Sequence, residues 1–124
     1  MNIEKLKVLY KKYELTKDDV FKHAHYVIIT RSGIDKIQGI AGIKIDYDVI
    51  KCETNFAVIK ASTDKLSTFG SALKGNTFKD GNTNSWYVME MAEKRAMSRL
   101  VLKTCGFYEL GVFGEDESED FKRK

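Results

Sequence analysis

The sequence predicts an α+β fold, in which an antiparallel three- to four-stranded β-meander packs against one long C-terminal helix, with short N-terminal helices. Two observations support this prediction. Apolar and polar residues alternate over 42–50, as in a half-buried strand, while 86–104 contains no glycine and consists mostly of strong helix formers. Short connections between the expected strands favour antiparallel pairing, because parallel strands need long crossovers.

Two short helices are expected before the sheet. Residues 2–13 carry apolar side chains at three- and four-residue spacing, which is typical of an amphipathic helix. Thr16 and Asp19 are spaced as in a capping box, so a second helix is expected from there toward His25.

Four segments have the composition of strands. Residues 26–30 are β-branched and aromatic, and the apolar residues of 42–50 fall on one face of an extended chain. Further strands are expected at 56–62 and near 66–73. Between the first two strands, Ser32 and Gly33 suggest a break, and 34–37 fits a single helical turn.

The long helix is bounded by residues suited to its ends. Asn84 or Ser85 is expected to cap its N-terminus, and Gly106 stands where a helix-terminating glycine belongs. One apolar stripe is expected to face the sheet, and it consists of Met89, Ala96, Met97, Leu100 and Val101.

The length and charge fit one small domain with a distinct tail. We expect a single α+β domain over 1–114 and a flexible tail over 115–124, acidic first and basic at its end. Without the tail the chain has 18 basic and 13 acidic residues, a net charge of +5 in place of +3. A modestly basic body suits a nucleic-acid binder, but it also suits many proteins that bind none.

Motifs of catalysis and cofactor binding are absent from the sequence. Neither GxSxG nor GxxxxGK[ST] occurs, so we expect neither an enzyme nor a cofactor. His23 and His25 share no helical face, which argues against a metal site, and Cys52 and Cys105 are expected as buried free thiols. No apolar run approaches about 20 residues and no signal peptide is visible, so a cytoplasmic protein without membrane contact is expected.

Three basic residues form a regular row on the long helix. Arg95, Arg99 and Lys103 recur every fourth residue, so their charges are expected to stack along one stripe and repel one another. Met91 and Phe107 occupy the positions four residues before and after, so no acid stands at four-residue spacing from either end of the row. A phosphate backbone would neutralise it. A solvated helix face, or acids elsewhere in the fold, would explain it equally well.

The same helix resembles a known family. The run MAEKRAMSR at 91–99, continued by LVLKTCGFYELGVFGEDES, is similar to the terminal helix of phage and prophage single-strand DNA annealing proteins of the Sak and ERF types, which are related to the eukaryotic annealing mediator of homologous recombination. The resemblance is strongest over 85–120 and extends weakly back through YVIITRSGIDKIQ. It implies an oligomeric ring or filament that holds single-stranded nucleic acid in a basic groove, with Arg95 and Arg99 facing that groove.

Basic and aromatic residues elsewhere add to the expected binding surface, because single-strand binders combine cations for phosphates with rings that stack on bases. Tyr47 and Phe56 are expected on core faces. Phe78 and Trp86 are the freer aromatics, although core packing also fits Trp86. The nucleic-acid-binding residues expected from the sequence are Arg31, Lys60, Phe78, Trp86, Lys94, Arg95, Arg99 and Lys103.

The sequence thus predicts a protein that binds single-stranded DNA and anneals complementary strands in phage or mobile-element homologous recombination, as a homo-oligomer. Two alternatives stay open. One is a double-stranded RNA-binding-like module, whose helix–meander–helix order is the same. The other is an oligomeric structural or interaction protein that binds no nucleic acid. The acidic tail would be a solvated terminus, dock a recombination or replication partner, or compete with nucleic acid for the basic groove.

Overall fold

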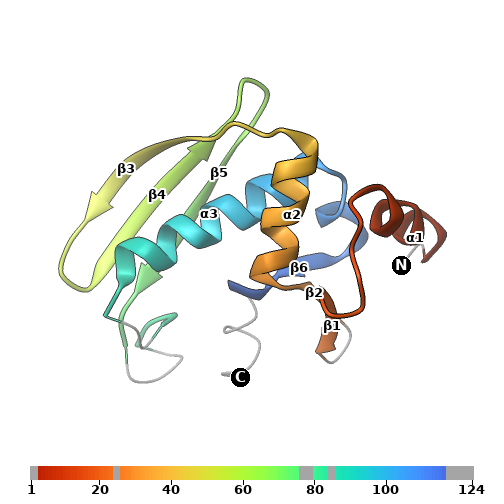
Figure 1. The fold of residues 1–124 in the computed structure, drawn as a ribbon. Coiled ribbons are helices and arrows are strands. Elements are labelled where there is room, and N and C mark those ends of the chain that lie inside the picture. Colours follow the sequence, from red (N-terminus) through yellow and green to blue (C-terminus); the bar gives the residue numbers. More distant parts are fainter. Residues whose placement is uncertain (1–2, 24–25, 76–79, 84–85, 117–124) are drawn as a thin grey trace.

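The computed structural model describes residues 3–23, 26–75, 80–83 and 86–116. Helices and strands follow one another in a mixed order (Figure 1). In chain order they are α1 (Ile3–Lys12), β1 (Val20–His23), β2 (Tyr26–Ile29), α2 (Arg31–Ala41), β3 (Asp46–Cys52), β4 (Phe56–Ser62), β5 (Ser67–Leu73), α3 (Val88–Thr104), the 3-10 turn η1 (Tyr108–Leu110) and β6 (Val112–Gly114).

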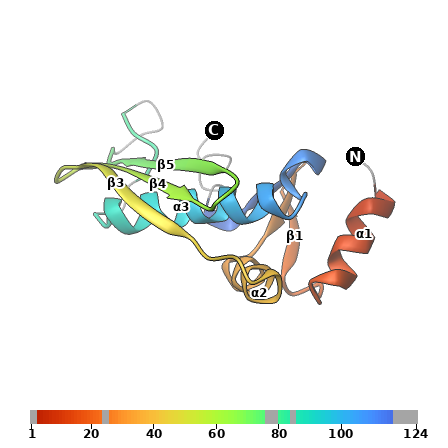
Figure 2. The same ribbon diagram turned by 90° about the horizontal axis from the view of Figure 1, so that it is seen from above.

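The predicted fold class is confirmed, with one addition. Strands β3, β4 and β5 form the expected antiparallel meander, and α3 packs along one of its faces (Figure 2). A second three-stranded sheet has the order β1-β2-β6, in which β2 and β6 run parallel. The strand expected at 26–30 therefore belongs to a different sheet from the meander.

Small residues allow α3 to lie close to the meander. The helix-facing positions of β4 are Ala57, Ile59 and Ala61, all buried. On β5 the closest approach is at Gly70, where a Cβ atom would collide with the backbone of α3. Thr68 adds a hydrogen bond across this interface, from its Oγ1 to the carbonyl oxygen of Ala96 at 2.7 Å.

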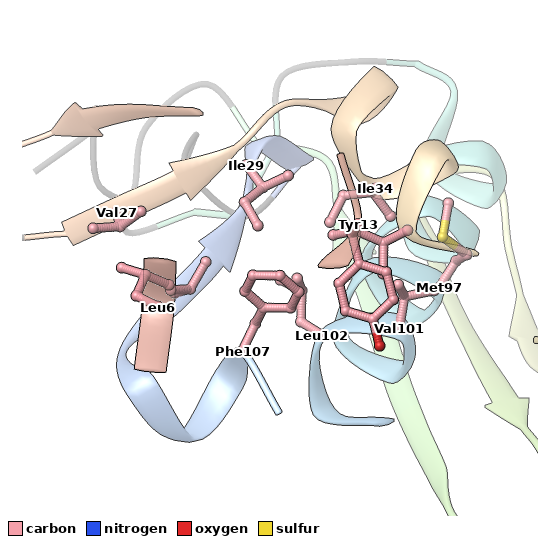
Figure 3. Packing of buried hydrophobic residues seen from close by; sticks show 11 residues of the cluster. Leu6, Tyr13, Val27, Ile29, Ile34, Met97, Val101, Leu102 and Phe107 are labelled. Carbon is pink, nitrogen blue, oxygen red and sulfur yellow. The ribbon is translucent and has the colours of Figure 1, made fainter. Parts of the chain in front are cut away.

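In its second half α3 also contributes to another hydrophobic core, formed with the second sheet, α1 and α2, while Leu100 stays in the core against the meander. Figure 3 shows Met97, Val101 and Leu102 of α3 turned toward side chains from those elements. The ring centroids of Tyr13 and Phe107 lie 5.8 Å apart in this core. Because α3 contributes to both cores, it joins the two sheets into one unit.

The helix expected from Thr16 toward His25 is wrong, because a turn followed by β1 occupies that segment. The Asp19 carboxylate does not open a helix. It accepts hydrogen bonds from the Thr16 N–H at 2.9 Å and from Lys36 Nζ at 2.7 Å. The bond from Lys36, followed by that from Thr16, lowers the pKa of Asp19.

The helical turn expected at 34–37 is a complete helix, α2. The Thr30 hydroxyl caps it by accepting a hydrogen bond from the Gly33 N–H at 3.1 Å, and Gly42 ends it with φ +66°. Gly33 is therefore not a break, because it stands in the first turn of α2. The strand expected at 42–50 begins later, at Asp46, and runs to Cys52.

The end of α3 matches the prediction, and the chain beyond it does not. Gly106 has φ +83°, and the Phe107 N–H donates to the Leu102 carbonyl at 2.9 Å, which closes the helix. The turn η1 and strand β6 that follow were not expected. Tyr87 stands at the N-cap position of α3, and Asn84 and Ser85 lie outside the described residues.

Candidate nucleic-acid interface

The basic row expected on α3 does not form. Arg95 is 2% exposed, and its guanidinium donates to the carbonyl oxygens of Ser71 and Asn82, both at 2.8 Å, while its Nε donates to the Asp116 carbonyl at 3.3 Å. This side chain cannot reach a bound phosphate. Its expected position in a basic groove is therefore wrong, because the fold uses the arginine to bond buried backbone carbonyls.

Arg99 has a related position one turn further along the helix. It is partly buried, and its Nη1 donates to the Phe69 carbonyl at 2.8 Å. Asn82 bonds the same strand, accepting from the Leu73 N–H at 2.7 Å and donating to the Ser71 carbonyl at 3.2 Å. Arg95, Arg99 and Asn82 thus satisfy backbone groups on the outer edge of β5.

The other two basic positions expected on α3 are exposed. Lys94 is one of them, and the other is Lys103, whose Nζ lies 5.3 Å from the centroid of the Tyr108 ring. The two arginines are bonded to backbone carbonyls, whereas these lysines are accessible to an anion.

The meander has a second face, which no described helix covers (Figure 2). Strand alternation turns residues 57, 59 and 61 of β4 toward α3, so their neighbours point the opposite way. We call this surface the open face of the meander. It carries Lys51, Phe56, Val58, Lys60, Phe69 and Leu73, and it also carries the acidic Asp48, directly across from Lys60.

Two lysine–phenylalanine pairs lie on the open face. Lys51 Nζ is 5.8 Å from the centroid of Phe56, and Lys60 Nζ is 5.9 Å from that of Phe69. Lys60 and Phe69 are direct cross-strand partners, and Phe56 is four residues from Lys60 on β4. At about 3.3 Å per residue the two rings are separated by roughly 13 Å along the strands.

The two pairs are at least partly accessible and only weakly engaged. The Phe69 side chain is 51% exposed, and Phe56 is half-buried. Lys51 also forms an ion pair with Glu53 at 3.5 Å, in which both side chains are more than half exposed. An exposed pair of this kind contributes little to stability, so an incoming phosphate can take the place of the carboxylate at little cost.

The aromatic residues expected from the sequence were partly the wrong ones. Phe56 was expected in the core and lies on the open face. Tyr47 is on the helix side of β3 but is 42% exposed. Phe69 was missed because the buried positions of β5 are Thr68, Gly70 and Ala72, so hydrophobicity points to the wrong face of this strand.

Trp86 is a further exposed ring with a cation beside it. The residue is 69% exposed, and Lys74 Nζ lies 4.0 Å from the ring centroid. Of the two alternatives for Trp86, the free aromatic therefore fits the structure and core packing does not. Phe78 lies outside the described residues.

Arg31 stands in the first turn of α2 and contacts acids from two parts of the chain. Its guanidinium lies 3.5 Å from Asp35 and 3.5 Å from Asp116, and its backbone N–H donates to Glu115 Oε1 at 3.0 Å. Ser98 also donates to the Asp116 carboxylate, at 3.1 Å. The first two residues of the expected tail are thus bonded to the body, and 117–124 lie outside the described residues.

No candidate metal site is found in the part of the chain that the structure describes. That part contains no group of three or more His, Cys, Asp or Glu residues that could hold a metal ion. Both cysteines are free thiols, and the expected burial is wrong for both, because Cys52 is exposed and Cys105 is half-buried. Burial raises the pKa of the half-buried Cys105 thiol. Among the helices of the described ranges, none has the length and apolar character to cross a membrane.

The chain was compared with protein-family models, with curated proteins and with solved structures, and none of the three comparisons found a match.

Proposed function

We propose that the protein binds single-stranded DNA on the open face of the meander. The observation that carries this proposal is the presence of two phenylalanines on that face, Phe56 and Phe69, each with a lysine beside it. Aromatic rings stack on unpaired bases, and the neighbouring lysines attract the phosphates that link those bases. Trp86 with Lys74 offers the same combination at a third place.

A single strand suits this surface better than a duplex. The exposed phenylalanine rings can stack only on bases whose faces are free. In a duplex, the faces of neighbouring bases are already stacked on one another. Binding to double-stranded RNA relies on contacts to phosphates and 2′-hydroxyls instead. A lysine-rich start of α3 would favour that alternative, but the helix begins with Val88, Met89 and Glu90.

The proposal extends to annealing in phage or mobile-element recombination, by a homo-oligomer in the cytoplasm. Stacking engages the faces of the bases and leaves their pairing edges available, so a bound strand can still pair with its complement. The basis for this extension is the resemblance of 85–120 to phage annealing proteins noted in the sequence, although the basic groove that it implies at Arg95 is not the surface proposed here. No cofactor is needed, because binding and pairing form no covalent bond.

The experiment is a binding titration with labelled single-stranded DNA, duplex DNA and double-stranded RNA. In the variant Phe56→Ala/Phe69→Ala we expect affinity for the single strand to fall about tenfold or more, since stacking contributes about 1–3 kcal/mol per base. Ile40→Ala is the matched control, because it removes an exposed apolar side chain from α2. Unchanged binding in the double variant would exclude the open face as the interface.

A salt titration tests the lysines separately. In Lys51→Gln/Lys60→Gln the slope of log affinity against log salt should fall by about 0.7 for each phosphate that the protein no longer neutralises. If none of the three nucleic acids binds at low salt, the protein belongs to the interaction class without nucleic-acid binding.

A further inference from the structure

Strand β3 leaves one edge of the meander open. Its seven residues, Asp46–Cys52, are all exposed, and β4 is the only described strand that pairs with it (Figure 1). Tyr47, Val49 and Ile50 are 42%, 59% and 56% exposed, respectively. An edge with unpaired N–H and C=O groups and apolar side chains is a template for pairing with another strand.

The opposite edge of the meander cannot serve as its partner. On β5 the carbonyls of Phe69 and Ser71 accept from Arg99 and Arg95, and the Leu73 N–H and carbonyl are both bonded to Asn82. Head-to-tail pairing, β3 of one copy with β5 of the next, would have to break these bonds. Of the two meander edges in a second copy, β3 is therefore the one that is open for pairing with β3 of the first.

A bulge in β3 fixes which residues of two such strands can face each other. Val49 pairs with Ile59 and Lys51 with Val58, so Ile50 is an extra residue. As a result Asp48 and Lys51 both lie on the open face, while Tyr47 and Cys52 both lie on the helix side. Directly opposed residues in a sheet must share a face.

We propose that two copies of this chain pair their β3 strands antiparallel, about a two-fold axis between Val49 and Ile50. This register places Asp48 of each copy opposite Lys51 of the other, and Tyr47 opposite Cys52, so both of these opposed pairs share a face. Shifting the register by one residue opposes residues from different faces. The Asp48–Lys51 pair occurs twice, once on each side of the two-fold axis, as an isologous interface requires.

The pairing produces one six-stranded sheet, in which the two α3 helices lie on the same side. The open faces of the two copies then form one continuous surface carrying four lysine–phenylalanine pairs. The proposal does not depend on nucleic-acid binding, since the partner is the protein itself and the association is measured without DNA.

A disulfide trap tests the register. Opposed Cα atoms in an antiparallel pair are about 4.5–5.5 Å apart, which is within the range of a disulfide. Tyr47→Cys should therefore give a covalent dimer with the natural Cys52 under mild oxidation, on a non-reducing gel. Tyr47→Cys/Cys52→Ser should lose it. Ser67→Cys, at an exposed position of the same sheet, is the control for random collisions and should give little dimer.

Charge reversal tests the pairing in solution. A single strand pair is a small interface, and small interfaces associate weakly, so mass is measured by sedimentation up to millimolar concentration. Asp48→Lys should raise the dimer dissociation constant about tenfold, because two repulsive Lys–Lys contacts replace two attractive ones, and Asp48→Lys/Lys51→Asp should restore it. A monomer throughout, or a dimer that neither responds to the charge reversal nor is trapped in the Tyr47→Cys variant, would overturn the proposal.

Discussion

The two edges of the meander are built differently. At the β5 edge, Arg95, Arg99 and Asn82 bond the outward carbonyls and amides of the strand, and residue 83 lies beside Lys74 in a short bridge. At the β3 edge, every residue is exposed and no described strand pairs with the outward side. The same three-stranded sheet thus has one edge that is closed by side chains and one that is available to a partner.

This difference changes how the basic residues of the chain should be interpreted. A regular row of cations on a helix suggested an anion, but an arginine has several donors in a planar fork that fit backbone carbonyls as well as phosphates. Arg95 and Arg99 use that capacity on β5. The cations of the proposed DNA-binding surface are instead lysines on strands, or directly after a strand. Each of them lies beside an aromatic ring, and they are Lys51, Lys60 and Lys74.

The closed edge should be sensitive to the loss of Arg95. Arg95→Ala removes the donor to the carbonyls of Asn82 and Asp116, while the Ser71 carbonyl keeps its longer bond from Asn82 at 3.2 Å. Each unsatisfied buried group costs about 1–3 kcal/mol, so we expect the free energy of unfolding in urea to fall by about 3 kcal/mol. Arg95→Lys should lie between this variant and the wild type, because one ammonium cannot reach every carbonyl that the guanidinium bonds.

A DNA-binding measurement on Arg95→Ala distinguishes a structural role of this arginine from the role in a basic groove that the sequence predicts. The fraction of Arg95→Ala that remains folded should bind single-stranded DNA as tightly as the wild type, with an unchanged salt slope. A protein of normal stability whose DNA affinity is lost would contradict the structural role of this arginine.

Arg99 should show a smaller effect, because it is less buried than Arg95 and its Nη1 bonds one carbonyl of β5, that of Phe69. We expect Arg99→Ala to lower the free energy of unfolding by about 1–2 kcal/mol. Lys103→Ala, one turn further along α3 and exposed, is the matched control and should stay within about 0.5 kcal/mol of the wild type. Equal losses in the two variants would mean that the β5 edge bond is not what stabilises the protein.

The open edge should tolerate substitution in the monomer. At concentrations too low for association, Val49→Ala and Ile50→Ala should each change the free energy of unfolding by less than about 0.5 kcal/mol, since most of each side chain is exposed. Ile59→Ala, directly opposite Val49 but buried, should cost about 2–5 kcal/mol. A large loss at Val49 would show that β3 is held by contacts other than its pairing with β4.

The sequence predicts those features that are encoded in residues close together along the chain. The meander, the long helix and the glycine at its end follow from periodicity and composition, and the structure has them. The sequence did not predict β1, because Thr16 and Asp19 have the spacing of a helix capping box but form a turn. The parallel pairing of β2 with β6 joins residues 27 and 112, and no local pattern reveals such a contact.

The candidate site shows the same limit. The roles of Arg95 and Phe69 depend on which face of β5 meets α3, and the helix-facing positions of that strand are threonine, glycine and alanine. A hydrophobicity pattern therefore assigns Phe69 to the core and leaves Arg95 outside it. The glycine at position 70, required by the close approach of the helix, was the one local signal for the true orientation.

The smallest effect expected on DNA binding concerns the acids that follow Asp116. Asp116 is bonded to Arg95, which itself bonds Ser71, so the chain at Asp116 lies beside the β5 edge, and Phe69 of the open face lies on that same strand. Glu117, Glu119 and Asp120 come next in the sequence. Neutralising only these three as Gln, Gln and Asn keeps the bonded Glu115 and Asp116 and the basic Lys122, Arg123 and Lys124.

At 0.01 M salt, where the Debye length is about 30 Å, the variant should bind single-stranded DNA about two- to threefold more tightly. The gain should vanish near 0.15 M, where that length is about 8 Å. Equal binding by both proteins at low salt would show that these acids do not compete with DNA, and docking of a recombination or replication partner would then be the better explanation of the tail.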